Sequence, residues 1–111
     1  MKKQYRVKQS KEFKQILDKK LILGKNSSFT IYSSINNLDH GRIGISVSKK
    51  NGNAVVRSKI RRQIRAMINQ TDILKNKLDL IIIVKQTYND NSFETNLENL
   101  KSIFDLVREK K

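Results

Sequence analysis

The sequence contains no cysteine, no proline and no tryptophan, and it has a single histidine among its 111 residues. Without cysteine the chain can form neither a disulfide nor a thiolate metal site, which favours a reducing compartment. The longest apolar run, residues 80–84, is too short to cross a bilayer, and the run at 21–23 is too short for the core of a secretion signal. These absences predict a cytoplasmic protein with no membrane partner.

Acidic residues are also scarce, and the basic residues are unevenly distributed. Lysine and arginine number 24 against 10 acids, which gives a formal net charge of +14. Residues 1–25 carry +7, residues 41–71 carry +8 without any acid, and residues 72–111 sum to zero, while four of the seven arginines fall within residues 57–65. Such an excess opposes folding by self-repulsion and is typical of a protein that meets a polyanion. The pattern predicts a nucleic-acid-binding surface, with a solvated helix face as the alternative.

Hydrophobic periodicity predicts helices and strands in mixed order along one domain that spans residues 1–111. The predicted elements are a helix over 10–20, a short strand or helix exit at 21–23, strands at 28–35 and 42–48, a helix over 53–69, a strand at 79–86 and a last helix from 91 or 92 to about 108. We expect the strands at 28–35 and 42–48 to form an antiparallel hairpin, and the run at 80–84 to lie centrally in the sheet. The fold class is therefore α+β. It is a two-layer α/β sandwich with a four-stranded sheet whose first strand is short, helices mainly on one face, and the order α-β-β-β-α-β-α.

The helix predicted over residues 53–69 divides into an apolar side and a basic side. Asn53 can cap its N-terminus. At about 100° per residue, one arc carries the apolar side chains, namely Val56, Ile60, Ile64, Met67 and Ile68. The adjoining arc of about 140° carries Arg57, Ser58, Arg61, Arg62 and Arg65, with Lys59 further round. We expect the first arc to enter the core and the second to present a basic ridge.

The segment from residue 42 to residue 65 carries the most specific pattern in the chain. It contains the pair Lys49-Lys50, then Gly52-Asn53-Ala54-Val55, and then a basic helix that starts with Arg57-Ser58-Lys59. This resembles the signature of the bacterial ribonuclease P protein subunit, in which a Gly-Asn-Ala-Val turn precedes an Arg-Asn-Arg-type basic helix. Glu12-Phe13 and Phe29-Thr30-Ile31-Tyr32 look like that family's first helix and first long strand, so the resemblance covers essentially the whole chain. Ser58 replaces the family's asparagine, and Lys59 and Arg61 stand where the family more often has arginine and lysine, which keeps the charge.

The resemblance implies both a fold detail and a division of labour. It implies a left-handed β-α-β crossover, against the general right-handed rule. It also implies that a catalytic RNA hydrolyses precursor tRNA and releases its 5′ leader, using Mg²⁺ held mainly by RNA and not by protein side chains alone. The protein would then be an accessory subunit of the enzyme without catalytic residues. Its partners would be the catalytic RNA subunit and precursor tRNA, with no obligate protein partner evident.

The family's two RNA-binding surfaces correspond to two sets of residues in this chain. The resemblance implies docking on the catalytic RNA by Lys49, Lys50, Asn53, Arg57, Lys59 and Arg62. It implies contact with the single-stranded leader by Phe13, Leu17, Tyr32, Ser58, Arg61 and Arg65. Guanidinium and ammonium groups neutralise phosphates, and aromatic faces stack on unpaired bases. Asn53 also suits a helix cap, and Phe13 at helical spacing also suits a core.

Other functions must be weighed against this resemblance. A self-contained nuclease needs clustered carboxylates near the bound phosphate, but residues 41–71 contain none, and His40 alone cannot form a histidine pair. His40 is therefore interpreted as an ordinary turn residue. A ribosomal or RNA-assembly structural protein without a leader-binding role shares the charge and size and is the main alternative. A helix-turn-helix is disfavoured by the strand that leads directly into the basic helix, and a membrane-surface helix by the absence of an aromatic anchor.

Overall fold

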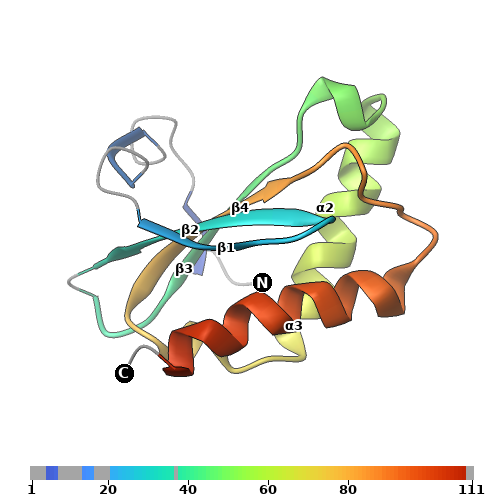
Figure 1. Ribbon diagram of the computed structural model, residues 1–111. Helices are drawn as coiled ribbons and strands as arrows, with labels where there is room; N and C mark the ends of the chain where they lie inside the picture. Colours follow the sequence, from blue (N-terminus) through green and yellow to red (C-terminus); the bar gives the residue numbers. More distant parts are fainter. Residues whose placement is uncertain (1–4, 8–13, 17–20, 37, 110–111) are drawn as a thin grey trace.

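A computed structural model describes residues 5–7, 14–16, 21–36 and 38–109, and it places a sheet against two long helices (Figure 1). The elements are β1 (Leu21–Lys25), β2 (Phe29–Ile35), β3 (Arg42–Ser46), a 3-10 turn η2 (Lys49–Asn51), α2 (Ala54–Asn69), a second turn η3 (Ile73–Lys75), β4 (Leu78–Val84) and α3 (Phe93–Glu109). Of the helix predicted over residues 10–20, only residues 14–16 are described, and these are helical. The α+β class and the order of elements are confirmed, and the run at 21–23 belongs to a strand.

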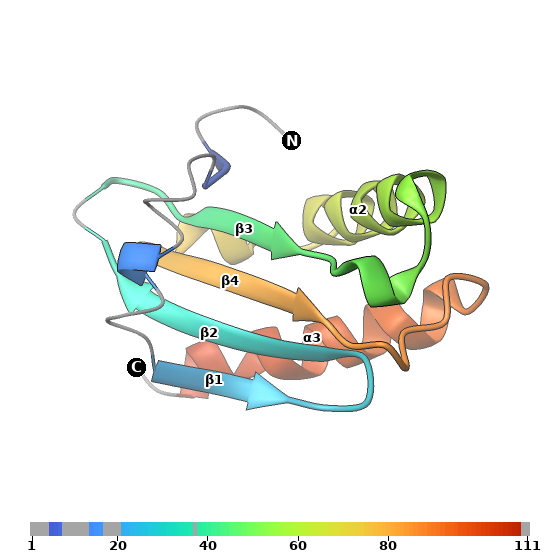
Figure 2. The ribbon, with the colours of Figure 1, turned by 90° about the horizontal axis from the view of Figure 1, so that it is seen from above.

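The sheet has the order β1-β2-β4-β3, with β1, β2 and β4 antiparallel and β3 parallel to β4 (Figure 2). The predicted hairpin between the second and third strands is therefore wrong. β4 lies between them, pairing Ile82 with Ile31 of β2 on one side and with Ile45 of β3 on the other. The physical reason is the composition of β4, whose apolar side chains on both faces are buried best at the centre of the sheet.

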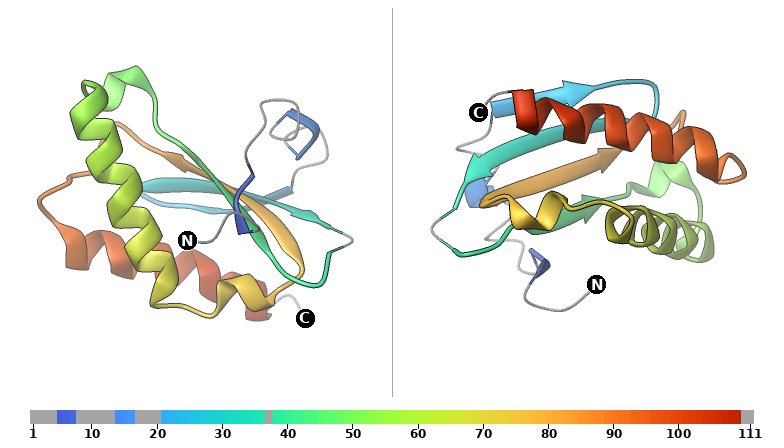
Figure 3. Two further views of the ribbon diagram at one scale, coloured as in Figure 1. Left: turned by 180° about the vertical axis from the view of Figure 1, so that it is seen from behind. Right: turned by 90° about the horizontal axis from the view of Figure 1, so that it is seen from below.

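The connection from β3 through α2 to β4 has the uncommon hand. In the right-hand view of Figure 3, the helices lie in front of the sheet. When that view is turned so that the parallel strands β3 and β4 point upward, β4 lies to the left of β3. The crossover is thus left-handed, as the resemblance implied and contrary to the general preference.

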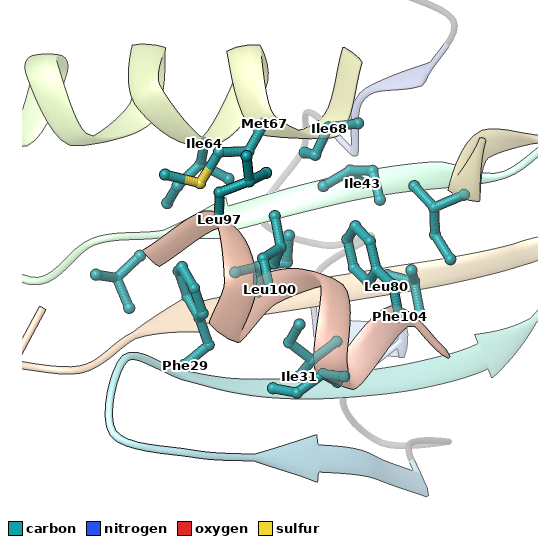
Figure 4. Packing of buried hydrophobic residues seen from close by; sticks show 14 of the residues in the cluster. Phe29, Ile31, Ile43, Ile64, Met67, Ile68, Leu80, Leu97, Leu100 and Phe104 are labelled. Carbon is teal, nitrogen blue, oxygen red and sulfur yellow. The ribbon is translucent and has the colours of Figure 1, made fainter. Parts of the chain in front are cut away.

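The main core lies between the sheet and the paired helices α2 and α3 (Figure 4). Each helix contributes its apolar stripe, and the strands contribute alternate residues, so that the fully buried side chains include Phe29, Ile31, Ile64, Met67, Leu80, Ile82 and Leu100. The predicted apolar arc of α2 is confirmed, because Ile60, Ile64, Met67 and Ile68 are buried and Val56 packs against the same cluster. This packing fixes the rotation of α2 and turns its basic arc away from the core.

The opposite face of the sheet is partly covered by the N-terminal part of the chain. Val7 and Ile16 are buried there with Ile81 of β4, and Tyr32 and Ile83 pack against them. The expectation of helices mainly on one face holds for α2 and α3. The helical residues 14–16 lie on the other face (Figure 1).

A glycine and a cap set the start of α2. Gly52 adopts φ 141°, in the region that side chains avoid, and a Cβ there would lie 2.9 Å from Cβ of Val56. The side chain of Asn53 accepts a hydrogen bond from the amide of Val56 at 3.0 Å, as its predicted capping role requires. The chain can therefore turn abruptly from η2 into α2.

We predict that Gly52→Ala destabilises the protein by about 1–3 kcal/mol, because the new methyl group meets Val56 in a strained backbone conformation. Urea unfolding followed by circular dichroism measures the change. Lys101→Ala, at an exposed position of α3, serves as the control and should stay within about 0.5 kcal/mol of the parent. Equal stability of the Gly52→Ala variant and the parent would contradict the assignment of Gly52 as an obligatory turn residue.

Candidate nucleic-acid interface

The basic residues of α2 are divided among three directions around the helix. Arg57, Arg61 and Arg65 recur every four residues and therefore lie along one flank of the apolar stripe. Arg62 and Ser58 are exposed on the outer side. Lys59 lies about 160° from Arg61 around the helix axis, on the opposite flank. The structure thus brings most of the predicted basic ridge together and separates Lys59 from it.

The arginine flank carries its charge without acidic partners in the described part of the chain. The Nε atoms of Arg57 and Arg65 are buried and have no hydrogen-bond partner among the described residues, and neither does Nε of Arg6. Burial lowers the pKa of Arg65, and the neighbouring charges of Arg6 and Arg61 lower it further. Arg6 therefore belongs to this surface. Sequence reasoning counted it within the basic block 1–25 but could not place it beside α2.

Lys59 forms an ion pair on the other flank, with its Nζ 3.3 Å from Oδ2 of Asp90. Gln63, one turn further along α2, donates to the backbone oxygen of Asp90 at 2.8 Å and accepts from the Tyr88 hydroxyl at 2.7 Å. Burial raises the pKa of Tyr88 to about 12, so this hydroxyl stays protonated as a donor at neutral pH. To contact RNA, Lys59 must either share its charge with the Asp90 carboxylate or break that ion pair. In this it differs from the arginines.

Lys49, Lys50 and Asn53 gather at the N-terminal end of α2. The two lysines are exposed in η2, and Asn53 is exposed while capping the helix. Two ammonium groups beside a helix N-terminus make a favourable environment for an anion. These three predicted docking residues therefore lie at the same end of α2 as Arg57.

The face of the sheet away from α2 and α3, called the open face below, carries Tyr32, one of the predicted leader contacts. Tyr32 of β2 is half-buried and packs against the cluster of Val7, Ile16 and Ile81, on the face away from α2 and α3. Tyr32 lies on the side of β2 opposite the buried Phe29 and Ile31, as the alternation of side chains along a strand requires. Phe13 and Leu17, the other two predicted leader contacts, lie outside the described residues.

Arg42 has a structural partner and does not add to the basic ridge. Its Nε and Nη2 atoms donate to the two carboxylate oxygens of Asp79 at 2.9 and 2.8 Å, and Asn36 donates to the same carboxylate at 2.9 Å. Asp79 is buried, so this two-pronged pair fastens β3 to β4. Local sequence patterns could not predict the pair, because its partners are 37 residues apart.

Two kinds of site are not found in the described part of the chain. Its histidine, aspartate and glutamate side chains form no group of three that could hold a metal ion. Its helices also lack the combination of length and apolar character that a membrane span requires.

Comparisons with known proteins identify the family to which the chain is similar. The family model for ribonuclease P matches residues 1–108. The ribonuclease P protein component of Mesoplasma florum is 43% identical over 105 residues, covering 93% of this chain and 94% of the relative. That of Streptococcus thermophilus is 36% identical over 109 residues, covering 97% and 96%.

Solved structures show the same likeness. The ribonuclease P protein of Staphylococcus aureus superposes with a TM-score of 0.81 at 36% identity, covering 93% of this chain and 94% of that one. The protein from Thermotoga maritima, at 23% identity and a TM-score of 0.78, supports the fold, with 89% and 94% covered. The chain belongs to the family of bacterial ribonuclease P protein components.

Proposed function

We propose that the chain binds the catalytic RNA of ribonuclease P through α2 and η2, and the single-stranded 5′ leader of precursor tRNA through the open face of the sheet. The observation that carries the proposal is the half-buried flank of arginines on α2, which has no acidic partner among the described residues. Phosphates would neutralise these charges, with release of counterions. Membership of the family supports this reading over that of a ribosomal or assembly protein.

The proposal assigns the hydrolysis to the RNA subunit. Mg²⁺ would be held mainly by RNA, and the protein would supply cations and an aromatic platform without a catalytic residue. The reaction would take place in the cytoplasm. Reconstitution tests the assignment: purified protein should leave precursor tRNA intact, and adding its RNA subunit should give Mg²⁺-dependent removal of the leader at physiological salt. Cleavage by nucleic-acid-free protein would contradict it.

We predict that Arg62→Ala flattens the dependence of log affinity for the RNA subunit on log salt by about 0.7–0.9, the contribution of one phosphate contact. Arg62 is suited to this test because it is exposed and its removal leaves the core intact. Filter binding over a salt series measures the slope. Lys77→Ala, which removes an exposed charge just before β4, is the control and should leave the slope unchanged. Identical slopes for the parent and Arg62→Ala would exclude Arg62 from docking.

We predict that Tyr32→Ala weakens holoenzyme binding to leader-bearing precursor by about 1–3 kcal/mol, because a base loses its stacking partner. Affinity for mature tRNA, which has no leader, should not change. Tyr32→Phe keeps the ring and should retain most of the affinity for the precursor. Fluorescence anisotropy with both ligands measures the difference, and an equal loss for precursor and mature tRNA would remove Tyr32 from the leader surface.

A further inference from the structure

Residues 5–7 run beside the free edge of β3 and bring an additional arginine to α2. Arg6 forms a parallel bridge with Ile43, and the amide of Val7 donates to the carbonyl of Ile43 at 3.0 Å. Val7 is buried on the open face of the sheet with Ile16 and Ile81. Because successive side chains of an extended segment point to opposite faces, the side chain of Arg6, the preceding residue, lies on the α2 side of the sheet. Its charge lowers the pKa of Arg65, as does the charge of Arg61.

Three guanidinium groups therefore converge from two segments far apart in the sequence. Nε of Arg6 and Nε of Arg65 are both buried without a hydrogen-bond partner among the described residues. Two described carboxylates pair with cationic side chains away from these arginines, Asp79 with Arg42 and Asp90 with Lys59. Like charges held together with unpaired donors raise the free energy of the folded protein, and an anion between them would remove that cost.

We propose that Arg6, Arg61 and Arg65 form a clamp for one phosphodiester group of the RNA strand that crosses the open face of the sheet. The clamp deepens the function proposed above and rests on it. Guanidinium groups are suited to the role because each offers donors in a fixed fork that matches phosphate oxygens. Arg6 would thus be a leader-binding residue on the N-terminal arm, working with two on α2.

The position of the clamp relates it to Tyr32. β4 and β3 lie between β2 and residues 5–7, so Arg6 and Tyr32 are about three inter-strand spacings apart, roughly 14 Å. The clamped phosphate should accordingly be within a few linkages of the base that stacks on Tyr32.

A neutral-linkage scan on the reconstituted holoenzyme tests the clamp. A series of precursor tRNAs carries one methylphosphonate each, at successive linkages of the leader, and affinity is measured by fluorescence anisotropy. The parent should lose about tenfold at one linkage, the value of a charge-assisted contact, and much less at the others. In Arg6→Gln the affinity for the all-phosphate precursor should fall by about the same factor, and the penalty at that linkage should disappear.

Two variants and a stability measurement keep the outcome interpretable. Lys77→Gln removes the same charge outside the clamp and should preserve the linkage-specific penalty. Arg65→Gln should abolish it as Arg6→Gln does, which supports the clamp even if one of the two variants is unfolded by circular dichroism. A penalty spread evenly over all linkages, or one that persists in both folded variants, overturns the clamp.

The same data distinguish the clamp from the function on which it rests. If the parent holoenzyme binds leader-bearing and mature tRNA equally, the leader-binding function itself fails. If the parent prefers the leader but no linkage is coupled to Arg6, the function stands and the clamp is wrong.

Discussion

The central position of β4 is the constraint from which the rest of the arrangement follows. Its buried residues Leu80, Ile81 and Ile82 need apolar cover on both faces and a paired strand on either side. Pairing with β2 and β3 satisfies the backbone, and α2 with α3 cover one face. β3 is consequently an edge strand, and its free edge receives residues 5–7. The N-terminal arm thereby reaches the side of α2 that carries Arg61 and Arg65.

The left-handed crossover has a consequence for the position of the basic helix. α2 lies beyond the end of β3 (Figure 2), and its buried residues join those of α3 in one core. The apolar arc of α2 is held by the core, so the arginine flank has one allowed orientation. A rigid helix that presents cations in a fixed row loses less entropy on binding a structured RNA than a flexible basic tail would.

Charge compensation inside the fold is selective. Asp79 neutralises Arg42 at the junction of two strands, and Asp90 neutralises Lys59 where α2 meets the loop before α3. Both carboxylates come from the part of the sequence where acids balance bases. The arginines of the other flank have no such partner among the described residues, although a cluster of like charges costs stability. These two carboxylates thus connect elements of the fold, and the arginine flank stays available to a polyanion.

Local sequence patterns were enough to predict the class of fold, the apolar and basic arcs of α2 and the cap at Asn53. Each of these depends on local periodicity or on a residue's own backbone preference, which a single chain displays directly. The sequence alone could not determine that β4 separates β2 from β3, because strand neighbours depend on which apolar faces find cover, and the hairpin rule favours the wrong pairing. Nor could it reveal that the charge of Arg6 acts on Arg65 or that Asp90 pairs with Lys59. These pairings arise only when the packed core fixes distant segments side by side, since the energy of a charged contact depends on distance in space and not along the chain.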